Sequence, residues 1–175
     1  MQKKVIIFDI PFDSFTLQEA LQQVKKMLVI PGQSHIATPN PEMLLEGEKN
    51  MLFRKLLQNT AMNIPDGTGI IFASKWLKTP LKERVTGTDL MKKIVAELLG
   101  KKIFLLGAAE EIAAKTALIL QNQFPKVKIA GVHSGSPKIE DEEKIIQKIN
   151  NSDAEILFVA YGAPAQEFWI ERNLK

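Results

Sequence analysis

The sequence contains no cysteine and only two histidines among its 175 residues. Without cysteine the chain has no disulfide framework, no zinc finger and no thiol nucleophile, and its composition suits a reducing compartment. His35 and His133 are far apart in the sequence, so they do not predict a metal-binding pair. No apolar run is long enough to span a bilayer or to form the core of a signal peptide, and we therefore expect a cytoplasmic protein.

Several catalytic and binding motifs are also missing. No Asp-x-Asp pair follows a predicted strand, which argues against a metal-dependent nucleotide-sugar transferase, and we expect neither a metal nor a cofactor. Asp9 and Asp13 are too far apart for an aspartyl phosphatase, and no nucleophile elbow supports Ser-His-Asp chemistry. Signatures of RNA recognition are absent, so we expect no nucleic-acid partner. The net charge of +3 is typical of an ordinary solvated surface.

The residues that are present favour a folded α/β domain. Hydrophobic residues make up 45% of the chain and charged residues 25%, which is enough to build a core, and the length suits one domain over residues 1–175. Short apolar runs typical of strands occur at 5–8, 35–38, 61–64, 102–106, 127–132 and 156–160. Helical periodicity occurs between and after them, at 17–28, 42–59, 69–77, 88–98, 110–124, 141–149 and 164–173. This alternation predicts a Rossmann-like fold, with a largely parallel sheet and helices on both faces.

Polar and glycine-rich segments follow four of these strands. They are residues 38–42, 65–69, 106–109 and 161–167. Ligands of parallel sheets bind beyond the C-terminal ends of the strands. We therefore expect all four segments to point to one rim.

Asp66 lies in the segment Pro65-Asp-Gly-Thr-Gly69, at the end of a predicted strand. A turn followed by a helix cap explains an aspartate here, and from the local sequence this interpretation is favoured. A carboxylate on a ligand rim can also act as a general base. Thr38 precedes a helix that begins near Pro41, so it either caps that helix or offers its hydroxyl to a substrate.

Three further positions have both a structural and a binding interpretation. Gly107 opens a turn in which the backbone can approach a phosphate or ribose, although a plain strand-to-helix connection is equally consistent. The Arg84 guanidinium suits a phosphate, but a surface ion pair is locally favoured. Gln166, at the start of a helix, can hydrogen-bond a base or a sugar. The segment Gly67-x-Gly69 lacks the third glycine of a dinucleotide fingerprint, which disfavours a nicotinamide-dependent oxidoreductase.

Five motifs occur in a fixed order along nearly the whole chain. They are Thr38-Pro-Asn-Pro-Glu-Met43, Pro65-Asp-Gly-Thr-Gly69, Arg84-Val-Thr-Gly-Thr-Asp-Leu90, Phe104-Leu-Leu-Gly-Ala108 and Gly162-Ala-Pro-Ala-Gln-Glu-Phe-Trp-Ile170. Each motif is modest alone, but their order is specific. In this order the sequence resembles the WecG/TagA/CpsF glycosyltransferase family.

The resemblance implies an inverting, metal-independent bacterial enzyme. Such an enzyme transfers N-acetylmannosamine from UDP-N-acetylmannosamine to undecaprenyl-diphosphate-linked N-acetylglucosamine, in synthesis of the wall teichoic acid linkage unit. The implied partners are the UDP-sugar donor, the lipid-linked acceptor and the inner face of the cell membrane, where the protein would be peripheral. The alternative is a non-catalytic nucleotide-sugar-binding module with the same fold.

The resemblance also assigns roles to individual residues. Asp66 matches the acid proposed as general base, and Thr38 matches a polar residue beside the reacting centre. Substrate-binding roles are implied for Asn40, Arg84, Gly107, Tyr161, Gly162 and Gln166. The last four of these fall where the nucleotide would lie.

The sequence departs from the family in two places. Members of the family continue beyond the Gln-Glu motif, so we expect a C-terminal appendage to be absent after Lys175. Its absence would lower turnover and uncover an apolar surface that favours a homo-oligomer. The segment His133-Ser-Gly-Ser136 lacks the aromatic residue common at this place in the family.

Overall fold

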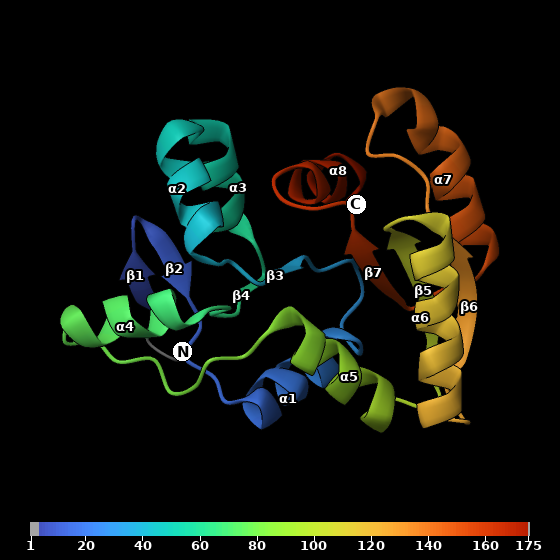
Figure 1. Cartoon of the computed structure of the whole chain (residues 1–175), viewed down its shortest axis with the longest axis horizontal. Coiled ribbons are helices and arrows are strands. Elements are labelled where there is room, and N and C mark those ends of the chain that lie inside the picture. The colour runs from blue at the N-terminus through green and yellow to red at the C-terminus, as the bar shows by residue number, and fades with distance from the viewer. Residues whose placement is uncertain (1–3, 175) are drawn as a thin grey trace. The chain divides into compact units, whose positions relative to one another are not determined.

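The computed structural model describes residues 4–174 and divides the chain into two compact units (Figure 1). The first unit comprises Met1–Leu90 and Ile170–Lys175, and the second comprises Met91–Trp169. Both units contain helices and parallel strands, which confirms the predicted α/β class. Within residues 4–174, no helix has the length and apolarity needed to cross a membrane.

The first unit contains two small sheets and several helices. Its elements are β1 (Val5–Ile7), β2 (Ile10–Phe12), α1 (Leu17–Met27), β3 (Ile36–Ala37), α2 (Pro41–Lys49), α3 (Met51–Asn59), β4 (Met62–Asn63) and α4 (Thr68–Trp76). The chain passes into the second unit within α5 (Gly87–Glu97) and returns within α8 (Ala165–Asn173). The helical region predicted at 42–59 is thus two helices, because the Asn50 side chain caps α3 at the point where α2 ends.

Strands β1 and β2 form an antiparallel hairpin that the sequence did not predict. Phe8 and Asp9 make its two-residue turn and both have positive φ angles, of 49° and 61°. Such turns usually contain glycine or asparagine, so the sequence carries no clear hairpin signal. Pro11 lies opposite Ile6 in the register. Because proline is uncommon within strands, the sequence of β2 looks like a break after the first strand.

Strands β3 and β4 are a short parallel pair held by the buried Asn63. The Asn63 side chain donates hydrogen bonds to the carbonyls of Pro11, at 3.0 Å, and Leu57, at 2.6 Å. Its backbone N–H donates to Asp13 Oδ2 at 2.9 Å. Asn63 therefore joins the end of β4 to the hairpin and to α3, and this fixes the start of the loop that carries Asp66.

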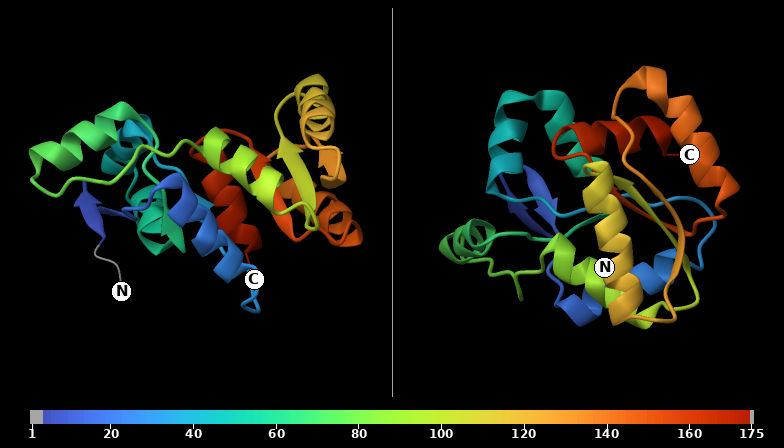
Figure 2. Two further views of the ribbon diagram at one scale, coloured as in Figure 1. Left: turned by 90° about the horizontal axis from the view of Figure 1, so that it is seen from below. Right: turned by 45° about the vertical axis from the view of Figure 1, so that its right-hand side comes forward.

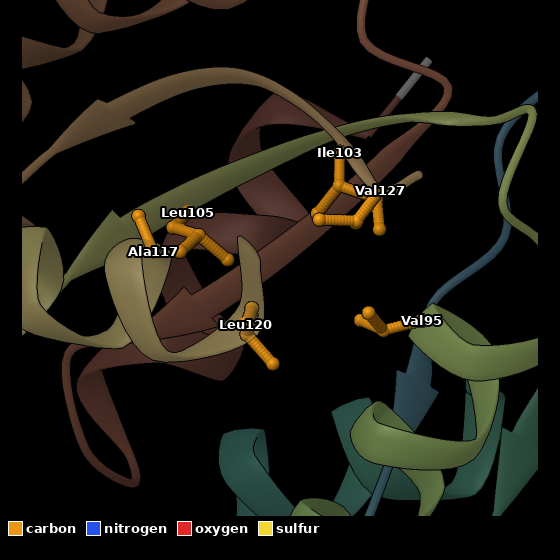
Figure 3. Close-up of a cluster of buried hydrophobic side chains, with 6 residues drawn as sticks. All are labelled: Val95, Ile103, Leu105, Ala117, Leu120 and Val127. Atoms are coloured by element: carbon orange, nitrogen blue, oxygen red, sulfur yellow. The ribbon is translucent and has the colours of Figure 1, made fainter. Parts of the chain in front are cut away.

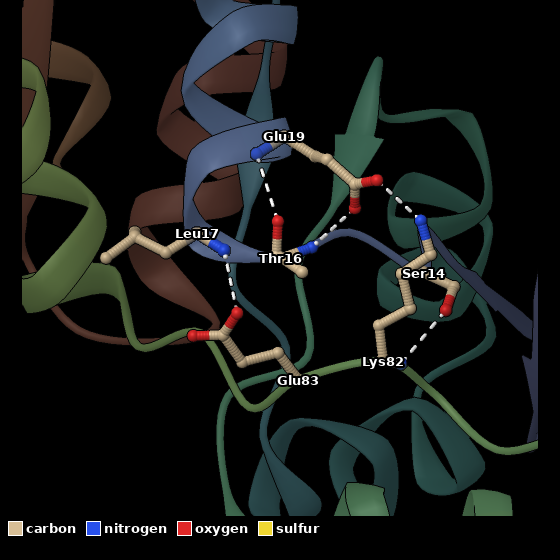
Figure 4. Close-up of polar contacts among 6 residues, drawn as sticks. All are labelled: Ser14, Thr16, Leu17, Glu19, Lys82 and Glu83. Carbon is tan, nitrogen blue, oxygen red and sulfur yellow. Dashed lines mark hydrogen bonds and ion pairs between the residues drawn. The ribbon is translucent and has the colours of Figure 1, made fainter.

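The N-terminus of α1 is tied to the segment that precedes Arg84 (Figure 4). Thr16 and Glu19 form a capping box, in which each side chain accepts a hydrogen bond from the other residue's backbone N–H. Lys82 forms an ion pair with Glu19 at 2.6 Å, and Glu83 accepts a hydrogen bond from the Leu17 N–H at 3.1 Å. These contacts hold residues 82–83 against the helix.

The second unit is built on a three-stranded parallel sheet with the order β6-β5-β7. Its complete elements are β5 (Lys102–Gly107), α6 (Glu110–Gln123), β6 (Lys128–His133), α7 (Ile139–Asn151) and β7 (Ile156–Ala160). Strand β6 lies on one side of β5 and β7 on the other, so the connection from β6 to β7 crosses over β5. Because such crossovers are right-handed, α6 and α7 lie on opposite faces of the sheet (Figures 1 and 2). The prediction of parallel strands with helices on both faces is confirmed here, but the parallel strands within residues 4–174 are divided between two sheets.

The core of the second unit lies between α5, α6 and the sheet (Figure 3). Its buried side chains are Val95, Ile103, Leu105, Ala117, Leu120 and Val127. Partly buried residues of β6 and β7, Ile129 and Phe158 among them, pack against this cluster. The alternation of apolar residues therefore predicted both the strands and the helix face that covers them.

A close cross-strand contact joins β5 to β6. The register shifts between Ile103 and Phe104, after which Phe104 lies opposite Gly131. A Cβ atom on Gly131 would come within 2.5 Å of the Phe104 ring, which is itself buried. The glycine therefore provides the space in which the aromatic ring packs.

We expect Gly131→Ala to lower the free energy of unfolding by about 1–3 kcal/mol, because the new methyl group overpacks the Phe104 ring. Urea unfolding followed by circular dichroism measures this change. Gly100→Ala is the matched control, since a Cβ atom at Gly100 would meet no atom within 4 Å. Equal losses in the two variants would contradict the proposed packing role.

A second prediction concerns His35, which lies just before β3 and is 6% exposed. Burial lowers the pKa of His35 to about 4, from an ordinary value of 6.5. As the pH falls from about 6.5 to about 4, the unfolded chain binds a proton that the folded chain does not, so the free energy of unfolding falls by at most about 1.4 kcal/mol per pH unit. Urea titrations of wild type and His35→Gln across this range measure the difference. Identical pH slopes in the two proteins would contradict this expectation.

Candidate functional site

Three loops of the first unit meet around Asp66. They are the loop after β3, which carries Thr38 and Asn40, the loop after β4, which carries Asp66, and the segment before α5, which carries Arg84. Backbone hydrogen bonds link them, from Asp66 N–H to Pro39 O and from Val85 N–H to Pro65 O, both at 3.1 Å. Residues from three of the sequence motifs are therefore brought together.

The Asp66 carboxylate is half-buried and held at one oxygen. Its Oδ2 accepts a hydrogen bond from the backbone N–H of Gly87 at 3.2 Å. Its Oδ1 has no hydrogen-bond partner among the residues that the structure describes. Asp66 also lies two residues before α4, while Gly87 is the first residue of α5, so the positive ends of two helix dipoles adjoin this carboxylate. One oxygen fixes the side chain and the other can accept a proton.

Gly87 also lies close to Thr38. A Cβ atom added to Gly87 would be 3.1 Å from Thr38 Oγ1, which is tighter than an ordinary van der Waals contact. Gly87 therefore contacts the threonine hydroxyl region and donates its N–H to Asp66. The absence of a side chain at residue 87 allows the two candidate catalytic residues to approach the same point.

Pro41 sets the path of the Asp66 loop. Cβ atoms added to Gly67 and Gly69 would come within 3.0 Å and 2.9 Å of the Pro41 ring. Gly67 also has a φ angle of +114°, which a residue with a side chain rarely adopts. The two glycines thus pack the loop against the first turn of α2, and no side chain caps the N-terminus of α4.

Arg84 is exposed, beside the anchored residues 82–83. Within residues 4–174, no carboxylate forms an ion pair with its guanidinium. The prediction of a surface ion pair for Arg84, which the local sequence favoured, is therefore wrong for the residues that the structure describes. A guanidinium without an internal partner can bind phosphate.

Asn40 has a structural role in addition to the predicted one. Its Oδ1 accepts a hydrogen bond from the Met43 N–H at 2.9 Å and caps α2, with Pro41 at the first helical position. Asn40, rather than Thr38, is therefore the cap of this helix. Only the side-chain N–H₂ group of Asn40 is left to bind a ligand.

In the second unit, the ends of β5 and β7 lie unusually close together. Gly107 is buried with a φ angle of +95°, and a Cβ atom there would be 2.6 Å from the Ala160 carbonyl carbon. The next residue, Ala108, donates its N–H to the Ala160 carbonyl at 2.8 Å. Glycine is thus required by the packing of the two strand ends, at the place where the strand order reverses and where ligands of such sheets bind.

The loop after β7 is held by the side chain of Gln166. Gln166 Oε1 accepts a hydrogen bond from the Gly162 N–H at 3.1 Å, and Nε2 donates to Glu167 Oε1 at 2.8 Å. Both ends of the amide therefore have partners within the protein. Gln166 shapes the loop, while Gly162, with a φ angle of +81°, is exposed and open to a ligand.

Two polar residues of the same region are the half-buried Tyr161, whose hydroxyl oxygen is buried, and the buried Glu167. Tyr161 packs edge-on against Trp169, with ring centroids 6.0 Å apart. Burial, with a smaller contribution from Asp141, raises the pKa of Tyr161 to about 12, so its hydroxyl is a proton donor at neutral pH. Burial also raises the pKa of Glu167, although the Gln166 amide acts in the opposite direction. In the described part of the chain, the Tyr161 hydroxyl and Glu167 Oε2 lack hydrogen-bond partners.

A cavity of about 350 Å³ lies beyond the C-terminal end of β6. Its lining comes from the loop after β6 and from one side of α7, and comprises His133, Ser134, Gly135, Ser136, Asp141, Lys144, Ile145 and Lys148. Lys148 Nζ is 3.4 Å from His133 Nδ1. Burial and the Lys148 charge lower the pKa of His133, so its ring is neutral at pH 7 and can accept this hydrogen bond. The cavity therefore offers two lysines to an anion.

The predicted site residues form two groups. Thr38, Asn40, Asp66 and Arg84 belong to the first unit, and Gly107, Tyr161, Gly162 and Gln166 belong to the second. Within each unit the residues lie on neighbouring loops. The prediction that all four strand-end segments share one rim remains a prediction.

Two features of these sites were not predicted from the sequence. One is the role of Gly87 in joining Thr38 and Asp66, although the glycine stands inside the Thr86-Gly-Thr-Asp89 motif. The other is the pair Lys144 and Lys148, which lie four residues apart on α7. Within residues 4–174, no cluster of three or more His, Cys, Asp or Glu side chains could hold a metal ion.

The sequence was compared with known proteins. Residues 5–175 match the model of the glycosyl transferase WecG/TagA/CpsF family. The chain is 31% identical over 171 residues to proteins named N-acetylglucosaminyldiphosphoundecaprenol N-acetyl-beta-D-mannosaminyltransferase from Staphylococcus aureus strains NCTC 8325 / PS 47, COL and MSSA476. The alignment covers 95% of this chain and 66% of each relative, so the chain spans about two thirds of their length.

The two roles of Asn40 can be separated by substitution. We expect Asn40→Ala to lower the free energy of unfolding by about 1 kcal/mol, because α2 loses its cap. Asn40→Asp keeps the capping oxygen and should preserve most of this stability, although it loses the N–H₂ group. Urea unfolding of the two variants measures the difference. An equal loss of stability in both would show that the cap is not what Asn40 contributes.

Proposed function

The chain belongs to the glycosyl transferase WecG/TagA/CpsF family, and on that premise we propose that it transfers N-acetylmannosamine from UDP-N-acetylmannosamine to N-acetylglucosamine on undecaprenyl diphosphate. The name of the S. aureus relatives supports the acceptor and the transferred sugar. The observation that carries the proposal is the carboxylate of Asp66. It is oriented by the Gly87 N–H, adjoins Thr38 and has one oxygen available for a proton.

In the proposed reaction Asp66 acts as general base. A hydroxyl of the acceptor sugar gives its proton to the free carboxylate oxygen, while the hydroxyl oxygen attacks the anomeric carbon of the donor. A new carbon–oxygen bond forms as the bond from that carbon to UDP breaks. Attack opposite the leaving group inverts the configuration of the anomeric carbon. The proton later passes from Asp66 to solvent, and UDP carries away the electron pair of the broken bond.

The leaving diphosphate needs positive charge as it departs. In the first unit Arg84 supplies a guanidinium, and the N–H of its neighbour Val85 binds the Pro65 carbonyl next to Asp66. In the second unit, backbone N–H groups at the start of α6 and the lysines of the β6–α7 cavity form a separate set of groups that can bind phosphate. We propose that phosphate-binding groups of this kind replace a metal ion. Tyr161 and Gly162 then contribute a phenolic hydroxyl and an open backbone to binding of the nucleoside.

The lipid-linked acceptor places the reaction at a membrane. Because undecaprenyl diphosphate is anchored in the bilayer, we propose that the protein works as a peripheral enzyme on the inner face of the cell membrane. It would leave the lipid in place and draw only the sugar end of the acceptor to Asp66.

We expect Asp66→Asn to reduce transfer by about 10²–10⁴-fold, because an amide cannot accept the acceptor proton. The assay follows transfer from UDP-N-acetylmannosamine to a lipid-diphosphate-N-acetylglucosamine analogue in the presence of a chelator. UDP binding, measured by calorimetry, should be retained in the variant.

Asp9→Asn serves as the matched control, because Asp9 is exposed in the same unit and its carboxylate pairs, among residues 4–174, only with Arg54. It should transfer at the wild-type rate. Full transfer by Asp66→Asn would exclude the general-base role. UDP binding without transfer by wild type would instead favour a non-catalytic binding module, and loss of transfer on chelation would exclude a metal-independent reaction.

A further inference from the structure

The outer face of α4 exposes large aromatic side chains to solvent. Phe72 and Trp76 are 71% and 77% exposed, and they are one helical turn apart. Ile70 and Ser74, which are almost fully buried, occupy the opposite side of the same helix. The helix therefore already has a core-facing side, and its aromatic residues are not needed to pack the first unit.

The charged residues of the segment that forms this face have one sign. Residues 67–82 contain no acidic residue, and they include three lysines. Lys82 is paired with Glu19, whereas Lys75 and Lys78 are exposed and form no ion pair among residues 4–174. Leu77, which is 44% exposed, lies between these two lysines.

The neighbouring strand adds further exposed apolar residues. Helix α4 packs beside β1 (Figures 1 and 2). Ile6 in that strand and Phe8 in the following turn are each 54% exposed. Exposed apolar residues are thus concentrated on adjacent elements rather than scattered singly over the surface.

We propose that this α4 face, formed by Phe72, Lys75, Trp76, Leu77 and Lys78, docks onto an anionic lipid surface. Aromatic side chains favour the boundary between headgroups and acyl chains, where an apolar ring and a polar edge are both accommodated. Lysines beside them are attracted to anionic headgroups. The aliphatic part of a lysine side chain can lie in the lipid while its ammonium group extends to the headgroups. A protein partner of ordinary composition would not require this combination of exposed aromatics and charge of a single sign.

The position of the α4 face fits the acceptor of the proposed function, on which this inference rests for its biological meaning. Helix α4 has nine residues and begins two residues after Asp66. At about 1.5 Å per residue the helix is about 13 Å long, and the two residues before it span at most about 7 Å, so the Asp66 backbone would stay within about 20 Å of the docked end. The sugar end of a lipid-linked acceptor can then approach the carboxylate while its polyprenyl chain remains in the bilayer.

Vesicle binding tests the α4 face without any substrate. The full chain is mixed with vesicles of phosphatidylcholine containing phosphatidylglycerol, or of phosphatidylcholine alone, and bound protein is measured by co-sedimentation. We expect stronger binding to the anionic vesicles, weakened by salt. The double variant Phe72→Ser/Trp76→Ser should lose binding by about tenfold or more, because it removes the two exposed aromatic side chains that would insert into the lipid. Lys75→Glu/Lys78→Glu should abolish the preference for anionic lipid.

The chain contains a matched control and an internal reporter. Leu118 and Ile119 on α6 are 60% and 54% exposed, so Leu118→Ser/Ile119→Ser removes exposed apolar side chains elsewhere and should leave vesicle binding unchanged. Of the two tryptophans, Trp76 is exposed and Trp169 is 1% exposed. A blue shift of fluorescence on anionic vesicles, lost in Trp76→Ser, would therefore report insertion of the α4 face.

Three results would overturn the proposal. They are absence of vesicle binding by wild type, unchanged binding in the Phe72→Ser/Trp76→Ser variant, and a concentration-dependent dimer in sedimentation that buries Trp76 in place of lipid. Transfer to a short, water-soluble acceptor separates this proposal from the proposed function. The Phe72→Ser/Trp76→Ser variant should keep that activity and lose transfer to the vesicle-bound acceptor. A wild type that binds vesicles but never transfers sugar would count against the function and not against the docking face.

Discussion

The hydrogen bond from the Gly87 N–H to Asp66 Oδ2 is the constraint on which the first unit's candidate site depends. It ties the loop after β4 to the start of α5, and the space beside Gly87 admits Thr38. Any side chain at residue 87 would press on the threonine. The buried Asn63 and the contacts of residues 82–83 fix the approach of the loops from either side.

In the second unit, as in the first, a glycine allows two parts of the chain to pack closely. Gly107 lets the end of β5 approach the Ala160 carbonyl, and the Ala108 N–H binds that carbonyl. In both units a glycine leaves room for a close neighbour, which is the Thr38 side chain at Gly87 and the Ala160 backbone at Gly107. Polar groups then remain near the strand ends, at the Asp66 carboxylate in one unit and at the Tyr161 hydroxyl and the lysine-lined cavity in the other.

Several polar residues serve the fold and the site together. Asn40 caps α2 with its oxygen, and Gln166 uses both ends of its amide to hold the loop after β7. Substituting such a residue changes loop geometry as well as any contact with a ligand, so loss of activity alone does not identify a binding residue. Asp66 and Arg84 differ, because each has a charged group with capacity beyond its contacts in the described chain.

The sequence by itself determined the α/β class, the parallel strands and most helices, because apolar periodicity reports burial directly. Its ordered motifs also identified the family and the loops that carry Thr38, Asp66, Arg84 and Gln166. The tertiary structure alone decided which of these groups are engaged, since hydrogen bonds such as that from Gly87 to Asp66 join residues far apart in the chain. It also revealed the β1–β2 hairpin, whose turn lacks the usual glycine, and the exposure of Phe72 and Trp76, which their apolar character would have assigned to the core. Local sequence patterns indicate which secondary structure a residue favours. Only the folded chain determines which residues it contacts and how far it is exposed to solvent.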